Sequence, residues 1–167
     1  MPKTGISVST YRSPITHLAK DEVFVFGANP QGFHGAGSAG YASFGEFGNK
    51  WREKGYDKKP KGWKGRWNVK GKVGPQVGTE GKSYGLITVA KAGARRSRTE
   101  EEMVGEFVKL YECCNRNPKW FFFLAQSGSV GLNGWSPDEM ASFMTKAGEI
   151  PDNLHLDETF ITFITGE

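Results

Sequence analysis

Two short runs of consecutive apolar residues limit the folds that this chain can adopt. Residues 23–26 read VFVF, and residues 120–125 read WFFFLA. A strand that carries apolar side chains on both of its faces is typical of the interior of a parallel sheet. We therefore predict two central strands at these positions, each covered on both faces by other parts of the chain.

A glycine-rich segment follows each of these runs. After the first run, glycines stand at positions 27, 32, 35, 37 and 40, and Gly27 is expected to end the strand. After the second run, residues 126–135 read QSGSVGLNGW. Small residues let backbone N–H groups approach a phosphate, and the start of a following helix adds partial positive charge. Glycines also serve ordinary tight turns, so the residues alone leave phosphate binding and plain loop geometry open.

Capping boxes predict the starts of two helices. Thr99 with Glu102 begins one helix, whose buried face comprises Met103, Phe107, Leu110 and Cys114. Ser136 with Glu139, and with Pro137 at the first helical position, begins the other, whose inner face comprises Met140, Phe143, Met144 and Ala147. A further helix is expected after the first glycine-rich segment, with a buried face of Ala36, Ala39, Tyr41, Ala42 and Phe44.

Further strands are predicted between and around these helices. They cover residues 6–8, residues 83–90, and a last stretch LHLDETFITFI that alternates over residues 159–164. A loop is expected around Tyr11. Strands that alternate with helices predict an α/β fold, with a mostly parallel sheet and helices on both faces. Ligands bind such sheets at the carboxyl ends of the strands, so we expect the two glycine-rich segments to clasp a diphosphate there.

The length of 167 residues is most simply one domain, with a basic, Gly- and Trp-rich insertion at about 48–82. The net charge is +4, and between Lys50 and Lys72 ten Lys or Arg residues stand against two acidic ones. Basic and aromatic residues together can neutralise phosphates and stack on bases. The alternative is a solvated loop that its tryptophans attach to the core.

A second, compact basic loop follows the strand predicted at residues 83–90. It contains Arg95, Arg96 and Arg98 within residues 91–98. These arginines are candidates for phosphate binding, and simple exposure to solvent is the alternative.

Few residues suit metal or redox chemistry. Cys113 and Cys114 are adjacent within a helical pattern, so buried thiols are expected rather than ligands or a disulfide. His17, His34 and His155 are scattered, and no metal site is expected. No apolar run reaches the roughly 18 residues of a membrane span, and the first residues lack the apolar core of a signal peptide. A cytoplasmic location is therefore expected.

Short motifs follow one another in a distinctive order over most of residues 15–147. They are Ile15-Thr16-x-Leu18, Gly27-Ala-Asn29, Gly32-Phe-His-Gly-Ala-Gly37, the set Gly78, Gly81, Ser83 and Tyr84, and Gly131-Leu-Asn-Gly-Trp135 before Ser-Pro-Asp-Glu. In this order the chain resembles the macrodomain superfamily, whose members bind ADP-ribose and related nucleotides. It resembles more closely a small macrodomain-like group of phages and bacteria.

This resemblance implies a macrodomain-like three-layer α/β/α sandwich with a central, mostly parallel mixed sheet. It implies a reader or sequestering module that binds ADP-ribose or a related NAD-derived nucleotide, without a further cofactor, in a bacterial or phage-infected cell. The distal ribose and its phosphate would contact Gly27, Asn29, Gly35, Ala36 and Gly37. The diphosphate would bind the backbone of Ser129, Val130, Gly131, Leu132, Asn133 and Gly134, with Trp135 beside the ribose. Asn29 has an alternative role as a turn residue in the left-handed region.

The sequence departs from the family's pattern at three places. Ser127 and Val130 stand where the phage-type group often carries an arginine and a cysteine. Ser13 and Pro14 stand where an aspartate commonly holds the adenine amine. Ser38 and Ala39 stand where de-ADP-ribosylating members often carry an aspartate. His34 can serve as an acid or base, since its unperturbed pKa is about 6.5, or it can contact the ribose or pack within the loop.

Three functions are therefore open. The first is nucleotide binding without turnover. The second is hydrolysis of an ADP-ribosyl or ADP-ribose-phosphate bond, with Asn29 and His34 as the catalytic candidates. The third is nucleic-acid binding through the insertion between Lys50 and Lys72, which would weaken steeply as salt rises because phosphate contacts release counterions.

Overall fold

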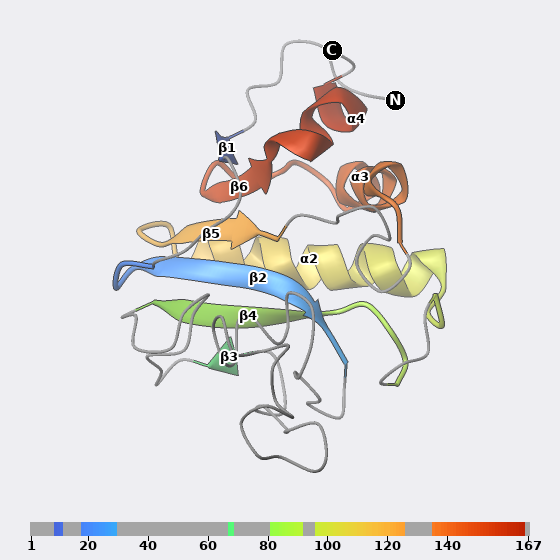
Figure 1. The fold of residues 1–167 in the computed structure, drawn as a ribbon, viewed down its shortest axis with the longest axis horizontal. Coiled ribbons are helices and arrows are strands. Elements are labelled where there is room, and N and C mark those ends of the chain that lie inside the picture. The colour runs from blue at the N-terminus through green and yellow to red at the C-terminus, as the bar shows by residue number, and fades with distance from the viewer. Residues whose placement is uncertain are drawn as a thin grey trace, which may run out of the picture.

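The computed structural model of the chain describes residues 9–11, 18–29, 67–68, 81–91, 96–125 and 135–165. Within this part of the chain, six strands form one sheet in the order β1-β6-β5-β2-β4-β3 (Figure 1). The strands are β1 (Thr10–Tyr11), β2 (Glu22–Ala28), β3 (Trp67–Asn68), β4 (Lys82–Ile87), β5 (Phe121–Leu124) and β6 (Leu154–Asp157). The described helices are α2 (Glu100–Arg116), α3 (Pro137–Lys146) and α4 (Ile161–Thr165).

The sheet is mostly parallel. β2 lies between β5 and β4 and is parallel to both, while β6 is parallel to β5 and to β1. The two-residue strand β3 runs antiparallel to β4. The predicted α/β fold with a mostly parallel sheet is therefore confirmed, and both apolar runs form interior strands.

The first apolar run forms a longer strand than the sequence predicts. β2 continues through Gly27 to Ala28, and Gly27 pairs with Leu86 of β4. The prediction that Gly27 ends the strand is therefore wrong. The ladder to β4 supplies backbone partners on that side, and these offset the low strand propensity of a single glycine. The predicted cover on both faces is confirmed for β2 but is wrong for the start of β5, where Phe121 is 50% exposed. β4 ends at Ile87, before the predicted end of that strand at Ala90.

The C-terminal stretch is a short strand followed by helix. β6 ends at Asp157, and a 3-10 turn (Glu158–Phe160) and α4 follow, so the alternating strand predicted over residues 159–164 is wrong. The Asp157 side chain caps the turn by accepting a backbone N–H two residues on. Phe160 and Ile164 are both buried, whereas Thr162 between them is exposed, which fits a helical spacing of four residues rather than an alternating pattern.

The edge strand β1 consists of Thr10 and Tyr11, where a loop was expected. The strand predicted at residues 6–8 lies outside the described residues. Tyr11 also reaches across β6. Its phenol donates a hydrogen bond to the Leu124 carbonyl at 2.5 Å, and its ring packs edge-on against Phe123 at 5.3 Å between centroids. These contacts join β1 to β5.

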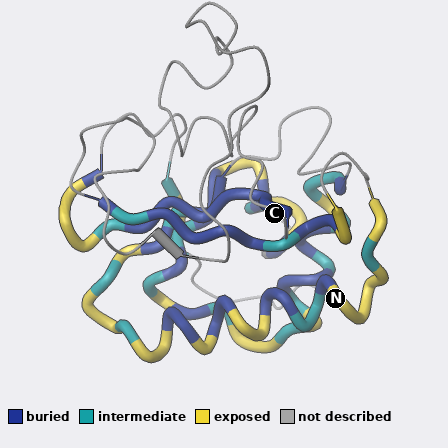
Figure 2. Tube along the Cα trace, turned by 90° about the horizontal axis from the view of Figure 1, so that it is seen from below, coloured by how far each residue is buried: buried dark blue, intermediate teal, exposed yellow. Residues whose placement is uncertain are grey.

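One face of the sheet shares a large apolar core with the helices. The strands contribute alternate residues, among them Val23, Val25, Tyr84, Leu86, Phe122, Leu124, Leu154 and Leu156. The predicted inner faces of α2 and α3 are confirmed, because Met103, Phe107, Leu110, Cys114, Met140, Phe143 and Met144 are buried in this core and Ala147 packs against it. Figure 2 shows α2 on one side of the strands.

The opposite face of the sheet is also apolar and buried. It carries Leu18, Phe24, Phe26, Ala28 and Ala125. The helix predicted to begin near residue 36, and with it the prediction of helices on both faces, lies outside the described residues. So does the basic insertion predicted at about 48–82, except for residues 67–68 and 81–82.

Both predicted capping boxes are confirmed. In α2 the Thr99 side chain accepts the Glu102 N–H, and the Glu102 carboxylate accepts the Thr99 N–H. Ser136 and Glu139 make the same reciprocal pair at the start of α3, with Pro137 at its first position. Each box satisfies two donors that a helix N-terminus otherwise leaves unpaired.

None of the helices in the described ranges has the length and apolar character needed to cross a bilayer.

Candidate functional site

The chain leaves β2 and β5 in opposite directions, although the two strands are neighbours. After β2 the chain re-enters the sheet at β3 and β4, on one side of β2, and after β5 it passes through α3 to β6 on the other side. In open α/β sheets such a switch point is where ligands bind, beyond the carboxyl ends of the strands. We call this end of the sheet, where β2, β4 and β5 finish, the carboxyl edge.

Both glycine-rich segments begin at the carboxyl edge. Asn29 directly follows β2 and is buried, and Ala125 directly follows β5. The Ala125 N–H donates to the Val25 carbonyl at 2.8 Å, and the Thr88 N–H donates to the Ala28 carbonyl at 3.1 Å. The exits from β5 and β4 are therefore both bonded to β2, which holds the three strand ends in register.

Asn29 thus lies at the switch point, and its predicted contact with a ribose stays a prediction. Its alternative role as a left-handed turn residue finds no support, because Arg96 is the one non-glycine residue with positive φ among those described.

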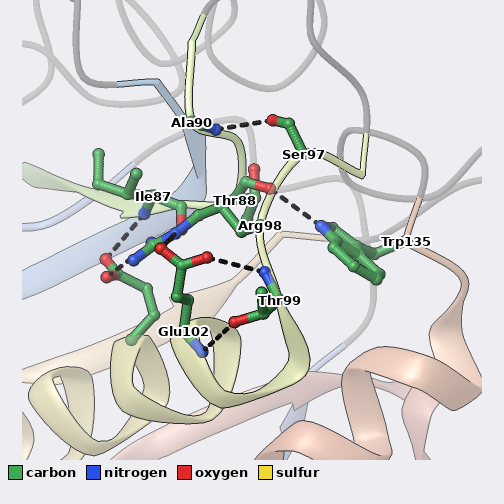
Figure 3. Close-up of polar contacts among 9 residues, drawn as sticks. Ile87, Thr88, Ala90, Ser97, Arg98, Thr99, Glu102 and Trp135 are labelled. Atoms are coloured by element: carbon green, nitrogen blue, oxygen red, sulfur yellow. Dashed lines mark hydrogen bonds and ion pairs between the residues drawn. The ribbon is translucent and has the colours of Figure 1, made fainter.

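Trp135 ends the second glycine-rich segment and is fixed to the end of β4. Its indole Nε1–H donates to the Thr88 carbonyl at 2.9 Å (Figure 3). The ring meets Phe143 of α3 edge-on, with centroids 5.2 Å apart, and the residue is only 6% exposed. Any contact of this ring with a ligand is confined to that small exposed part, so the contact with a ribose stays a prediction.

Arg96 covers the ring of Trp135. Its guanidinium carbon lies 4.7 Å from the ring centroid, and its two terminal nitrogens donate to the Glu139 carboxylate at 2.6 and 2.7 Å. This bidentate bond to Arg96 lowers the pKa of Glu139 to about 2. Arg96 also has a φ of 55°, in the left-handed region that a residue with a Cβ rarely adopts. We call Arg96, Trp135 and Glu139 the Arg96 clamp.

A second charged pair holds the end of β4. Glu106 is completely buried in α2, and its carboxylate accepts the Ile87 N–H at 2.9 Å and an Arg98 guanidinium N–H at 3.1 Å. The same Arg98 nitrogen donates to the Ile87 carbonyl at 2.6 Å. Charged side chains therefore satisfy both backbone groups of Ile87, the last residue of β4, and fix this strand end to α2.

The turn between β4 and α2 is closed by one more hydrogen bond. The Ala90 N–H donates to the Ser97 hydroxyl at 2.8 Å, close to the Arg98 contacts and to the capping box at Thr99 (Figure 3). Arg96 and Arg98 both bind carboxylates, and Arg98 is only 15% exposed, so simple exposure is wrong for Arg98. Arg95 lies outside the described residues.

The N-termini of α2 and α3 are poor anion sites. Acidic residues fill both first turns: Glu100, Glu101 and Glu102 in α2, and Asp138 and Glu139 in α3. Their charges already complement the helix dipoles, and each capping box occupies two of the N–H groups that an anion could otherwise bind. A bound phosphate would therefore depend on the glycine-rich segments themselves.

The described part of the chain contains three of the predicted site residues. Gly27 lies within β2, Asn29 at its end, and Trp135 at the start of α3. The other predicted positions lie outside the described residues: the catalytic candidate His34, and Gly35, Ala36, Gly37, Ser129, Val130, Gly131, Leu132, Asn133 and Gly134. Their roles stay predictions.

Sequence reasoning missed both charged pairs at the carboxyl edge. One signal was present for the buried pair, because Glu106 stands within the apolar stripe of α2, between Met103 and Phe107. An acidic residue at such a position needs a partner. No comparable signal marks Arg96, whose partner Glu139 is far along the chain.

The two cysteines are core thiols, as predicted. Cys113 and Cys114 are free and buried, and burial raises the pKa of both. Across the described ranges no group of three or more His, Cys, Asp or Glu side chains is arranged to hold a metal ion.

These features define an open α/β protein with a switch point between β5 and β2. Searches against models of known protein families and against curated proteins found no match to the sequence.

Proposed function

We propose that this protein binds ADP-ribose or a related NAD-derived nucleotide at the carboxyl edge, as a reader or sequestering module. The observation that carries the proposal is the switch point between β5 and β2. Two neighbouring parallel strands end there, and each leads directly into a glycine-rich segment. Glycine-rich backbone beside the ends of parallel strands suits a diphosphate, because N–H groups can approach its oxygens closely.

The proposal includes a macrodomain-like three-layer sandwich. The buried apolar face that carries Phe24, Phe26 and Ala28 requires a cover, and α2 and α3 occupy the other face.

The electrostatics of the edge favour recognition by backbone rather than by free cations. Arg96 and Arg98 both form ion pairs with carboxylates, so a phosphate would have to compete with these carboxylates for either guanidinium group. Binding through backbone N–H groups releases few counterions, and it should depend only weakly on salt. Nucleic-acid binding through Lys50 to Lys72 would instead weaken steeply.

Calorimetric titration with ADP-ribose, NAD and AMP tests the proposal, with the ligands recovered and analysed by chromatography. We expect saturable binding of ADP-ribose and recovery of intact ligand. Loss of ligand would show turnover and place the protein among the hydrolases, with His34→Ala and Asn29→Ala as the next variants.

Two variants locate the site. Gly37→Val is expected to abolish nucleotide binding by adding bulk to the first glycine-rich segment, while Gly105→Ala serves as the matched control in α2. A Cβ at Gly105 meets nothing within 4 Å, so this control should bind as the wild type does. Wild-type affinity in Gly37→Val would refute the two-segment site.

A third variant tests the alternative of nucleic-acid binding. It neutralises four lysines of the insertion together: Lys58, Lys59, Lys61 and Lys64. ADP-ribose affinity should survive this change. Loss of ADP-ribose affinity would mean that the insertion forms part of the nucleotide site. If neither the wild-type protein nor any variant bound a nucleotide, the proposed function would be refuted.

A further inference from the structure

We propose that Arg96 is a positioning residue for the nucleotide site, which it serves through Trp135 and Glu139 without contacting the ligand. This inference rests on the proposed function. It concerns the second glycine-rich segment, which begins after Ala125 and ends at Trp135. Both ends of this segment are bonded to the sheet, at the Val25 carbonyl and at the Thr88 carbonyl.

Trp135 determines where the second glycine-rich segment returns to the fold. One hydrogen bond fixes the edge of its ring to Thr88, and Phe143 supports it from α3. Arg96 covers the ring face, with the guanidinium carbon 4.7 Å from the centroid. A guanidinium stacked on an indole is attracted by the ring quadrupole, so Arg96 restricts the ring to this orientation.

Glu139 holds Arg96 in place over the ring. Its carboxylate takes both terminal nitrogens of the guanidinium, which fixes the plane of the guanidinium as well as its position. Glu139 also belongs to the capping box of α3, directly after Trp135. The clamp therefore ties together the turn before α2, the end of the glycine-rich segment and the start of α3.

The backbone of Arg96 indicates that this arrangement is imposed by the surroundings. A φ of 55° is unfavourable for a residue with a Cβ, and the turn would accept glycine more readily. The contacts of the Arg96 side chain with Trp135 and Glu139 supply a reason for its presence.

The consequence for binding is preorganisation. When both ends of a binding segment are fixed in the free protein, less conformational freedom is lost on binding. The affinity of the protein for the ligand is then higher. Releasing Trp135 from the clamp should therefore weaken ADP-ribose binding by about three- to tenfold, which corresponds to the ordering of one or two side chains. The loss should appear in the entropy of binding rather than in its enthalpy.

The discriminating variant is Arg96→Gly. It removes the clamp and also relieves the unfavourable φ, so the thermal stability of the free protein should change little. A merely structural role for Arg96 would move stability and affinity together, whereas a positioning role lowers affinity alone. Arg96→Lys keeps the charge but loses the planar fork, and it should also bind more weakly.

Lys146→Met supplies the matched control. Lys146 and Glu100 form an ion pair between α3 and α2 whose side chains are 53% and 59% exposed, against 51% and 30% for Arg96 and Glu139. This ion pair joins the last residue of α3 to the first residue of α2 and does not involve Trp135 or Glu139. Lys146→Met should bind ADP-ribose as the wild type does.

Thermal unfolding of the free proteins and calorimetric titration with ADP-ribose complete the test. Weaker binding in both Arg96 variants, with unchanged thermal stability in Arg96→Gly and wild-type binding in Lys146→Met, supports the inference. A parallel loss of stability and affinity in Arg96→Gly would overturn it in favour of a structural role. Affinity within twofold of wild type in Arg96→Gly and Arg96→Lys would overturn the inference and leave the proposed function standing. Absence of ADP-ribose binding by the wild-type protein would overturn both.

Discussion

Replacement of Glu106 by leucine tests how the end of β4 is held. The wild-type carboxylate is completely buried, accepts the Ile87 N–H at 2.9 Å and binds Arg98 at 3.1 Å. Leucine keeps the apolar volume in the core of α2 but offers no acceptor. The variant therefore leaves a backbone donor unsatisfied and a nearly buried guanidinium without this carboxylate.

The magnitude follows from these two losses. An unsatisfied buried donor costs about 1–3 kcal/mol, and breaking a buried ion pair from one side costs about 3–5 kcal/mol. Because both losses arise from the same carboxylate, they overlap, and we expect about 3–5 kcal/mol in the free energy of unfolding. Glu106→Gln keeps an acceptor for the Ile87 N–H and should cost about 1–3 kcal/mol, since it loses a hydrogen bond to a charged group.

Urea unfolding followed by circular dichroism measures these differences, with Glu100→Gln as the control. Glu100 is exposed on the same helix, and its loss should change stability by less than about 1 kcal/mol. Hydrogen exchange adds a local measurement, in which the Ile87 amide loses protection in Glu106→Leu. If that variant fails to fold, the glutamine variant carries the test. The reasoning would be refuted if the free energy of unfolding of Glu106→Leu lay within about 1 kcal/mol of the wild-type value. It would also be refuted if Glu106→Gln were as stable as the wild type.

Three further predictions concern stability, and urea unfolding checks each. Gly105→Ala should stabilise the protein by about 0.5–1 kcal/mol, because a Cβ at this mid-helix position meets nothing within 4 Å. Gly81→Ala should destabilise the protein by about 1–3 kcal/mol, because the new Cβ would lie 2.2 Å from the Leu18 Cβ. Equal effects of the two substitutions would contradict this reasoning. Thr99→Ala should cost about 1 kcal/mol through loss of the cap of α2, and no loss would mean that the box does not stabilise the helix. Burial lowers the pKa of His155 below its usual value of 6.5, so protonation favours the unfolded state, and stability should fall as the pH drops from about 6.5. His155→Phe should weaken this pH dependence of stability, and an unchanged pH profile in the variant would contradict the prediction.

Local signals in the sequence were sufficient to predict the helices α2 and α3 and the interior strands β2 and β5. The capping boxes at Thr99 and Ser136 act within a few residues, so the sequence shows them completely. The apolar runs of β2 and β5 need no distant partner to be recognised, because only a sheet interior accommodates apolar side chains on both faces.

Predictions failed where distant residues decide the local structure. Gly27 stays within β2 because β4 pairs with it, and Tyr11 forms a strand because β6 lies beside it. At the C-terminus, the alternation over residues 159–164 competed with a helical spacing of Phe160 and Ile164. The Asp157 cap favours the helical turn there, and the sequence alone did not rank that signal above the alternation.

The position of the candidate site could be predicted, because the sequence shows a glycine-rich segment directly after each of two interior strands. Its charged contacts could not be predicted. Arg96 and Glu139 are separated by an entire helix and strand, and only the fold brings them together. Reading Arg96 and Arg98 as a basic loop overlooked the carboxylates that meet them in space.

The arrangement of charges narrows what the carboxyl edge can do. The arginines nearest to it are bonded to carboxylates, and the first turns of α2 and α3 are acidic. A phosphate placed against either helix N-terminus would face like charge, which raises the free energy of binding there. Among the described residues, neither helix N-terminus nor the two carboxylate-bound arginines favours a diphosphate, so the proposed site depends on the glycine-rich segments. On the proposed function, Gly37→Val should therefore abolish binding, because it adds bulk where the glycine-rich backbone would supply the donors.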